Sequence, residues 1–349
     1  MTPLKKILII IVVVFLGLVT IGIVLLFRQR GGSNYIEPAK VSDINMLWPK
    51  VKADQSEVYY FKNVENPGFY KMALADKKEE KISSTLDTPD KVLWSPNARR
   101  ALIFITYDKQ NMEKYGSPFS DLQAADQTPM KWVYDFESKK LSRLDSRIID
   151  IAWMTDDKII YQLQKDNQAS INISDYDGQN WEKVVDSPAV YIDQIISFAN
   201  DKLYFLATPG EGIRNFYVLD IKSKDMSEKL KDVGGSAIVN NDLVLIEISQ
   251  DNVTQLYWAD LKQPDLNNTK IIATVQKAVW LNQDKFLVAI GGGRTDKLII
   301  EDIVTGETRT LSYSEKEFSL DTQNLVIIDK TVYFTSNNVL YKLDLSKKL

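Results

Sequence analysis

The sequence predicts an all-β domain, a β-propeller of seven blades, behind one N-terminal transmembrane helix. Two repeating patterns and one long apolar run carry this prediction. The first pattern is an aspartate that ends an apolar strand and recurs at spacings of 40, 45, 40, 42 and 42 residues. A period of about 40 residues filled with strands is typical of a propeller. A first copy without the aspartate ends near Leu74, and the aspartates are Asp135, Asp175, Asp220, Asp260, Asp302 and Asp344.

The second pattern is an apolar strand that ends near an aromatic or branched residue and leads into a polar turn. Its clearest copy is Val-Leu-Trp-Ser-Pro-Asn at 92–97, followed by the apolar stretch 101–105. Asn and Asp suit such turns because they tolerate left-handed backbone angles. Seven copies of each pattern indicate seven blades. The other strand ends are Trp48, Trp153, Phe198, Val239, Trp280 and Ile328.

These patterns give each blade four strands, A to D, counted outward from the central channel. Strand A ends at the aromatic position and strand C ends at the aspartate. The chain stops at Leu349, soon after the seventh C strand, so the seventh D strand must come from elsewhere. We expect residues 34–41 to supply it by pairing outside 339–344, because Pro38 suits an edge strand. The propeller domain would then cover 34–349, with its two ends in one blade.

Residues 7–27 form an uninterrupted apolar run of 21 residues. As a helix this run measures roughly 31 Å, which matches a hydrocarbon core of about 30 Å. A cleaved signal peptide is the alternative, but its apolar region is usually about 7–15 residues, and no small-residue cleavage site follows. Without cysteine the chain is not a lipoprotein. We expect an uncleaved anchor, with residues 1–6 as a cytoplasmic head and residues 28–33 as a linker.

Charge determines orientation only weakly, because Lys5 and Lys6 on one side oppose Arg28 and Arg30 on the other. A short head before the helix and a large domain after it favour an extracytoplasmic propeller. Setting these four basic residues aside leaves 39 basic against 47 acidic residues, a net charge near −8. This charge argues against nucleic acid or an anionic lipid surface as the main partner.

The chain contains no histidine and no cysteine. This excludes a Ser-His-Asp triad, a histidine-based zinc site and a thiol nucleophile. An enzyme would have to use carboxylates, lysines, tyrosines or a calcium ion held by oxygen ligands. Because the recurrent aspartates are near-equivalent, we assign them a shared structural task, the acceptance of backbone N–H groups in the C-to-D turns. We predict no catalytic residue, cofactor or metal site.

Three local motifs resemble binding sites incompletely. Residues 175–180 begin like a calcium loop but lack its third ligand and closing glutamate. Residues 174–181 resemble a sialidase-type Asp box, with Tyr176 where that motif requires an aspartate. The glycine run at 291–294 is not followed by Lys-Ser or Lys-Thr, as a phosphate-binding loop requires. We interpret these segments as a hairpin turn and a flexible B-to-C loop.

The segment 108–130 breaks the period and joins strands B and C of the second blade. In a propeller the B-to-C loops share one face with the D-to-A connections. Exposed aromatic and arginine side chains on long loops of a rigid face are typical of a protein-binding surface. The alternative is an excursion without a partner. The candidate binding residues are Tyr115, Phe119, Arg214 and Arg294.

The run Leu-Trp-Ser-Pro-Asn at 93–97, with Ala-Leu-Ile-Phe at 101–104, resembles the Trp-Ser-Pro-Asp-Gly repeat of TolB-like and WD-type propellers. Residues 216–220 resemble the next strand of that repeat. The likeness covers roughly residues 45–345 at the level of the repeat, with Asn97-Ala98 in place of Asp-Gly. It implies an interaction platform in the bacterial envelope. We therefore predict a non-catalytic scaffold for an envelope or secreted protein. The alternative is a carbohydrate-active hydrolase that uses carboxylates or calcium in the channel.

Overall fold

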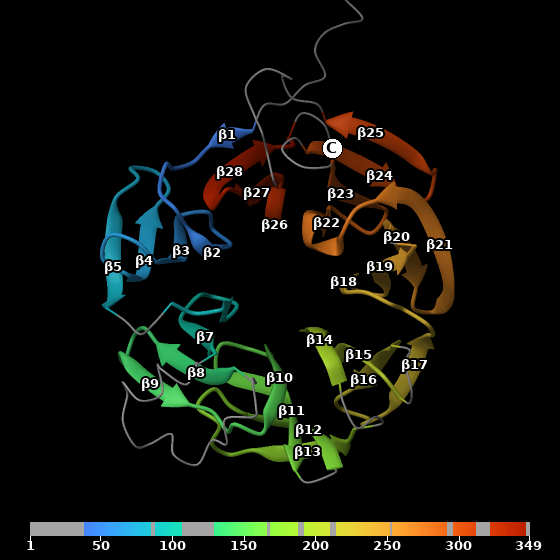
Figure 1. Ribbon diagram of the computed structural model, residues 1–349, viewed down its shortest axis with the longest axis horizontal. Helices are drawn as coiled ribbons and strands as arrows, with labels where there is room; N and C mark the ends of the chain where they lie inside the picture. The colour runs from blue at the N-terminus through green and yellow to red at the C-terminus, as the bar shows by residue number, and fades with distance from the viewer. Residues whose placement is uncertain are drawn as a thin grey trace, which may run out of the picture.

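Seven four-stranded antiparallel sheets surround a central axis in the computed structural model of the chain (Figure 1). The chain is therefore an all-β, seven-bladed propeller, as the repeat predicts. In each blade, strands that follow one another in the sequence are neighbours in the sheet, with one exception in blade seven. The structure describes residues 38–84, 88–106, 129–165, 168–187, 192–209, 214–251, 253–291, 296–311 and 322–346.

The first four blades follow the order of the chain, with strands A to D running outward from the central axis. Blade one contains β2 (Leu47–Val51), β3 (Glu57–Lys62), β4 (Gly68–Ala73) and β5 (Glu79–Ser84). Blade two contains β6 (Lys91–Trp94), β7 (Arg100–Ile105), β8 (Met130–Asp135) and β9 (Lys140–Arg143). Blade three contains β10 (Ile148–Trp153), β11 (Lys158–Lys165), β12 (Gln168–Asp175) and β13 (Glu182–Asp186). Blade four contains β14 (Ile192–Ala199), β15 (Lys202–Ala207), β16 (Asn215–Asp220) and β17 (Met226–Leu230).

The remaining blades are built in the same way, and a single 3-10 turn, η2 (Val275–Lys277), precedes blade six within the described residues. Blade five contains β18 (Ala237–Asn240), β19 (Leu243–Gln250), β20 (Val253–Asp260) and β21 (Gln263–Ile272). Blade six contains β22 (Ala278–Trp280), β23 (Lys285–Ile290), β24 (Lys297–Asp302) and β25 (Glu307–Leu311). Blade seven contains β26 (Thr322–Ile328), β27 (Thr331–Ser336), β28 (Val339–Asp344) and β1 (Ala39–Lys40).

Blade seven joins the two ends of the domain. Strand β1 pairs antiparallel with the outer edge of β28, with Ala39 opposite Lys342. The N–H of Val41 extends this pairing by donating to the carbonyl of Leu340 over 2.9 Å. The described strand is shorter than the segment 34–41 expected from the sequence, since residues 34–37 lie outside the described residues. The outer edge of β28 is thus covered by a strand from the other end of the domain.

Strand β2 departs from the repeat. The sequence pattern predicts its end at Trp48, but the strand continues to Val51. Its register against β3 shifts between Leu47 and Lys50, and Trp48 has a φ of 49°. This is a β-bulge, in which an extra residue bends the strand without ending it. The prediction was wrong here because Trp48-Pro49 resembles the end of the other A strands.

The core lies between the blades, because each sheet buries both faces against its neighbours. All six side chains of β7 are buried. On one face Leu102 packs with Ile151 and Ile159 of blade three, and on the other face Ile103 packs with Phe61 of blade one. Burial of each such side chain contributes about 1.5–3 kcal/mol. This packing explains why the B strands read as continuous apolar runs.

Five of the six recurring aspartates accept backbone N–H groups as the sequence predicts, whereas Asp175 Oδ2 accepts the side-chain amide of Asn180 over 2.7 Å. In three of them one carboxylate oxygen accepts two backbone N–H groups, at distances of 2.9 to 3.0 Å. These three are Asp135, Asp220 and Asp302. Asp260 and Asp344 each accept one N–H, from Lys262 and Ser346. Asp135, Asp220, Asp260 and Asp302 therefore stabilise C-to-D turns, and Asp344 caps the chain after the last C strand.

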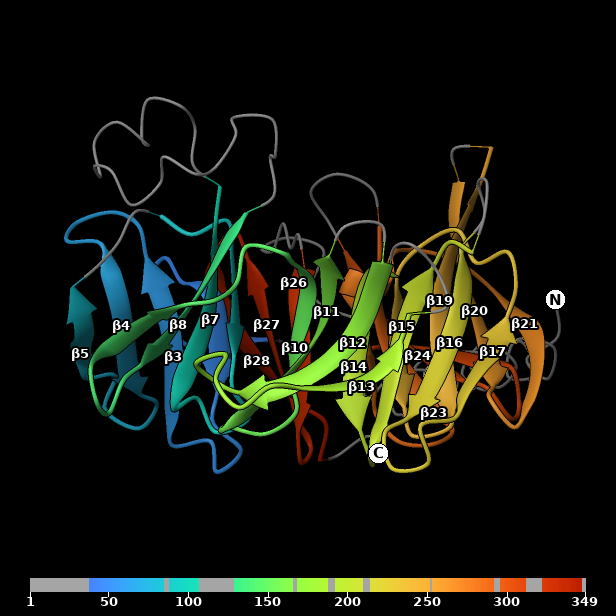
Figure 2. The ribbon, with the colours of Figure 1, turned by 90° about the horizontal axis from the view of Figure 1, so that it is seen from below.

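The connections between strands divide between two faces of the ring (Figure 2). The B-to-C and D-to-A connections share one face, which we call the B–C face. The A-to-B and C-to-D turns form the opposite face, the hairpin face. Strand β7 ends and β8 begins on the B–C face, as the sequence predicts, and Met130, the last residue of the predicted insertion, already belongs to β8.

The predicted transmembrane segment, residues 7–27, lies outside the described residues. In the described parts of 38–346, no helix has the length and apolar character needed to cross a bilayer.

Candidate functional site

One of the four predicted binding residues lies in the described part of the B–C face. Arg214 immediately precedes β16 and is exposed. Its Nε lies 3.8 Å from Oδ2 of Asp193 on the A strand of the same blade. Tyr115, Phe119 and Arg294 lie outside the described residues.

Two long hairpins project on the B–C face. Strands β11 and β12 pair over eight residues each, as do β19 and β20, which reach above their neighbours in Figure 2. The second hairpin stays in register to Gln250 opposite Val253, and Val253 is 45% exposed. Near its tip the hydroxyls of Ser249 and Thr254 lie 2.8 Å apart. These hairpins are ordered platforms because their strands are hydrogen-bonded to the tip.

Acidic side chains near this face join neighbouring blades. Asp150 Oδ2 accepts the N–H of Ile195 over 2.6 Å, from blade four. Glu247 Oε2 accepts the N–H of Val275 over 2.9 Å, from the segment that leads into blade six. The same relation recurs between Asp296 and Thr322 of blade seven, at 2.7 Å. Each carboxylate therefore holds the start of the next blade, a structural role that the sequence pattern did not indicate.

Two lysines approach one of these carboxylates. Lys91, Phe104 and Lys131 lie opposite one another on adjacent strands of blade two. The Lys91 and Lys131 ammonium groups lie 5.3 and 5.9 Å from the Phe104 ring centroid. The pKa of Lys131 is lowered to about 8, chiefly by burial and also by Lys91, while the carboxylate of Asp150 opposes the shift. Burial likewise raises the pKa of Asp150. The Lys131 Nζ donates to the carbonyl of Pro129 over 3.1 Å.

A buried arginine joins blades two and three on the hairpin face. The Arg100 Nε lies 2.8 Å from Asp135 Oδ2, and its Nη1 lies 2.7 Å from Asp157 Oδ1 and from the carbonyl of Asp156. Its guanidinium lies 3.8 Å from the ring centroid of Tyr176. Burial alone would raise the pKa of Asp135, but the Ser138 N–H and the Arg100 guanidinium outweigh it and the pKa is lowered.

The contact between Arg100 and Tyr176 explains the role of residues 174–181, the incomplete Asp box. Tyr176 occupies the position where that motif requires an aspartate, and its ring lies against Arg100. Trp181 at the end of the motif is 60% exposed. The segment is a hairpin turn that supports the contact between blades, in agreement with the sequence-based interpretation.

Within the residues that the structure describes, no group of three or more acidic side chains is arranged to hold a metal ion.

Comparison with solved structures supports the fold. A prolyl endopeptidase structure matches with a TM-score of 0.53 at 12% identity, over 89% of this chain and 50% of that one. The propeller domain of the Trilobed protease from Pyrococcus furiosus, described as having an open velcro topology, gives 0.52 at 14% identity, over 78% and 86%. A β-propeller domain from Myceliophteria thermophila gives 0.53 at 9% identity, over 89% and 100%.

These similarities concern the fold alone. This chain spans half the length of the prolyl endopeptidase structure. TolB from Acinetobacter baumannii superposes with a TM-score of 0.44 at 12% identity, so the TolB-like resemblance rests on the repeat. Neither a family model nor a curated protein matches this chain. The class of protein is a seven-bladed propeller whose last blade is completed by an N-terminal strand.

Proposed function

We propose that the chain is a membrane-anchored, extracytoplasmic scaffold that binds another envelope or secreted protein through the B–C face. The observation that carries this proposal is the projection of the β19–β20 hairpin from a closed ring. Its tip at Gln250 and Val253 is exposed, while the strands below it are paired throughout. A rigid support for exposed loops is the usual arrangement of protein-binding surfaces.

The hydrogen bonding of the carboxylates near this face supports a binding role over a catalytic one. Asp150, Glu247 and Asp296 accept backbone N–H groups at the junctions between blades. A glycoside hydrolase needs two carboxyl groups that face the same substrate bond. Carboxylates occupied at three separate junctions favour a structural role. The repeat-level resemblance to TolB-like and WD-type propellers points the same way.

The proposed location rests on the sequence. The apolar run 7–27 would anchor the chain, with residues 1–6 in the cytoplasm and residues 28–33 as the linker to the propeller. Extraction of native membranes at alkaline pH tests this location. We expect the full chain to stay in the pellet and a chain lacking residues 7–27 to be released. Release of the full chain would contradict the anchor.

Replacement of residues 107–128 by an Asn-Gly turn tests the binding role. After crosslinking in intact cells, proteins co-isolated with the full chain would be quantified by mass spectrometry. We expect the replacement to remove a partner that the wild type retains. The matched control replaces exposed residues 222–224 of a C-to-D turn by Gly-Ser-Gly and keeps the partner. Recovery of the same partners by both variants would refute a partner site at 107–128, and recovery of none by the wild type would refute the scaffold.

A further inference from the structure

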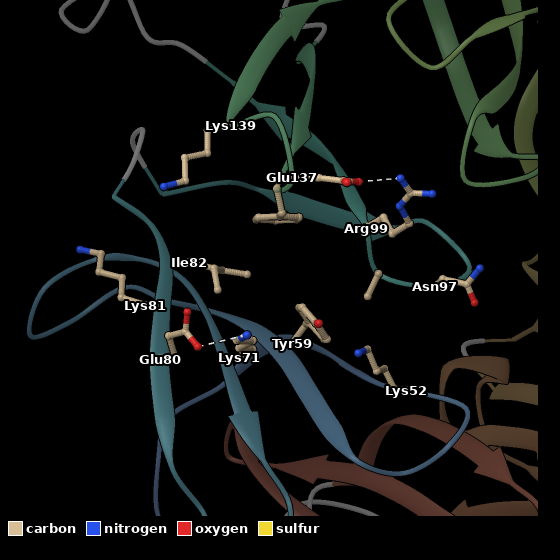
Figure 3. A pocket seen from close by; sticks show the side chains of 12 residues that line it. Lys52, Tyr59, Lys71, Glu80, Lys81, Ile82, Asn97, Arg99, Glu137 and Lys139 are labelled. Atoms are coloured by element: carbon tan, nitrogen blue, oxygen red, sulfur yellow. Dashed lines mark hydrogen bonds and ion pairs between the residues drawn. The ribbon is translucent and has the colours of Figure 1, made fainter.

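A basic groove lies between blades one and two on the hairpin face, on the other side of the ring from the proposed partner surface (Figure 3). Its volume is about 380 Å³, within the range of about 300–1,000 Å³ typical of ligand sites. Turns of both blades and the outer strands β4 and β5 form its walls. The groove is therefore formed jointly by two blades.

The charge of the groove is opposite to that of the chain. The whole chain has 43 basic and 47 acidic residues. The groove has five basic and two acidic lining residues, which are Lys52, Lys71, Lys81, Arg99 and Lys139 against Glu80 and Glu137. A local excess of positive charge on an acidic protein attracts anions selectively to that place.

Three of the five basic residues have carboxylate partners. Lys71 lies 3.1 Å from Glu80, Arg99 lies 2.6 Å from Glu137, and Lys52 lies 2.7 Å from Glu57 outside the groove. These pairs are partly or largely exposed, so they stabilise the fold little. These pairs neutralise three of the five basic side chains, so the remaining positive charge of the groove lies on two lysines.

Those two lysines are Lys81 and Lys139. The Lys81 ammonium donates to the side-chain oxygen of Asn66 and lies 5.8 Å from the Tyr70 ring centroid. Within the described residues neither lysine has a carboxylate partner. In Figure 3 the ends of both lysine side chains lie on the same side of Ile82. Two ammonium groups are therefore available for a ligand that also contacts Ile82.

The base of the groove is apolar and firmly supported. Tyr59, Ile82 and Phe136 line it. The Phe136 ring stacks on Trp94 with centroids 5.6 Å apart, and Tyr59 meets Trp94 edge-on at 5.8 Å. A rigid aromatic base loses little conformational entropy when an apolar group binds to it.

We propose that this groove binds an acidic peptide segment that carries an apolar side chain next to its acidic residues. The carboxylates would pair with Lys81 and Lys139, and the apolar side chain would cover Ile82 and Phe136. A phosphodiester chain fits less well, because Arg99, whose guanidinium could bind a phosphate through two hydrogen bonds, already pairs with Glu137. Two single ammonium groups beside an apolar base match side-chain carboxylates that lie next to an aliphatic residue.

Fluorescence anisotropy with the full-length chain in non-ionic detergent tests the proposal. The probe is fluorescein-labelled Gly-Asp-Glu-Leu-Glu-Asp, and the comparison peptides are Gly-Asn-Gln-Leu-Gln-Asn and the acidic peptide with Gly in place of Leu. We expect the acidic peptide to bind at low salt and to weaken as salt rises. Removal of the charges, or of the leucine, should each weaken binding about tenfold.

The charge-reversal variant K81E/K139E should bind the acidic peptide at least about tenfold more weakly than wild type. The matched control is K78E/K140E, which changes the net charge equally at exposed positions outside the groove. Equal binding by both variants would overturn the proposal, as would absence of binding up to about 1 mM probe. Tighter binding of a twelve-residue oligothymidylate than of the peptide would also overturn it. Because the scaffold test concerns the other face, the two proposals fail independently.

Discussion

Replacement of Arg100 by methionine tests how the blades are joined. The Arg100 and Asp135 side chains are 8% and 7% exposed and 2.8 Å apart. Removing one partner of a buried ion pair costs about 3–5 kcal/mol, because the other charge stays buried. Asp135 keeps its backbone donors at Glu137 and Ser138, so we expect about 3 kcal/mol, the lower end of that range. The double variant Arg100→Met/Asp135→Asn should recover part of the loss.

Urea unfolding of the full-length chain in detergent, followed by tryptophan fluorescence, measures this cost. The matched control is Arg147→Met, because the Arg147–Asp145 pair is exposed and should contribute no more than about 1 kcal/mol. The Asp135 pKa is lowered in the folded state, so its stabilisation is present above the unfolded pKa of about 3.9 and is lost as pH falls through the folded pKa. The cost of Arg100→Met should therefore shrink in acid. Equal losses of unfolding free energy for Arg100→Met and Arg147→Met at pH 7 would refute this reasoning.

Three further predictions concern stability and use the same unfolding assay. Removal of residues 34–41 loses the Val41–Leu340 hydrogen bond and the burial of Val41, so the free energy of unfolding should fall by about 3 kcal/mol. Light scattering should show aggregation through the exposed β28 edge. Unchanged stability would argue against this closure of the ring. Lys131→Met should stabilise the fold at pH 7. Because the pKa of Lys131 is lowered to about 8 in the folded state, wild-type stability rises between pH 8 and the unfolded pKa of about 10.4, and the stabilisation by Lys131→Met should vanish over that range. Destabilisation by Lys131→Met at pH 7 would contradict the lowered pKa. Lys140→Met is the exposed control. Asp302→Ala should cost about 1 kcal/mol through its turn donors Val304 and Thr305, and a cost near zero would remove the turn role.

The ring was predictable because its evidence is periodic. The aspartates mark the strand ends, and the register of the structure adds a feature that the sequence pattern did not reveal. The first residue of strand B lies opposite the aspartate of strand C, and in four of the six blades with that aspartate it is basic. These residues are Arg100, Lys158, Lys202 and Lys285. Their recurrence could have been found in the sequence once the strands were aligned.

The contacts between blades were not predictable in the same way. Asp150 holds Ile195, and Arg100 contacts Asp157 and Tyr176, across strands of different blades. A period of about 40 residues says which segments are strands, but not which side chains meet across two separate sheets. The basic groove was missed for this reason, since Lys81 and Lys139 come from different blades.

The candidate binding residues come from B-to-C loops of one face, and only Tyr115 and Phe119 lie in the segment that breaks the repeat. Arg214 lies on the predicted face, beside Asp193. Loop length indicated a face but not the paired hairpin β19–β20, whose eight-residue strands are only two residues longer than the B and C strands of blades four and six. Its exposed tip at Gln250 is now the better position for a probe.

Site-specific photocrosslinking in native membranes tests the scaffold proposal most directly. A benzophenone amino acid would replace Gln250 at the tip of β19, or Lys224 in an exposed turn of the hairpin face. We predict a discrete adduct with another protein from position 250 and none from position 224. Adducts from Lys224 alone, or none from Gln250, would contradict a partner on the B–C face.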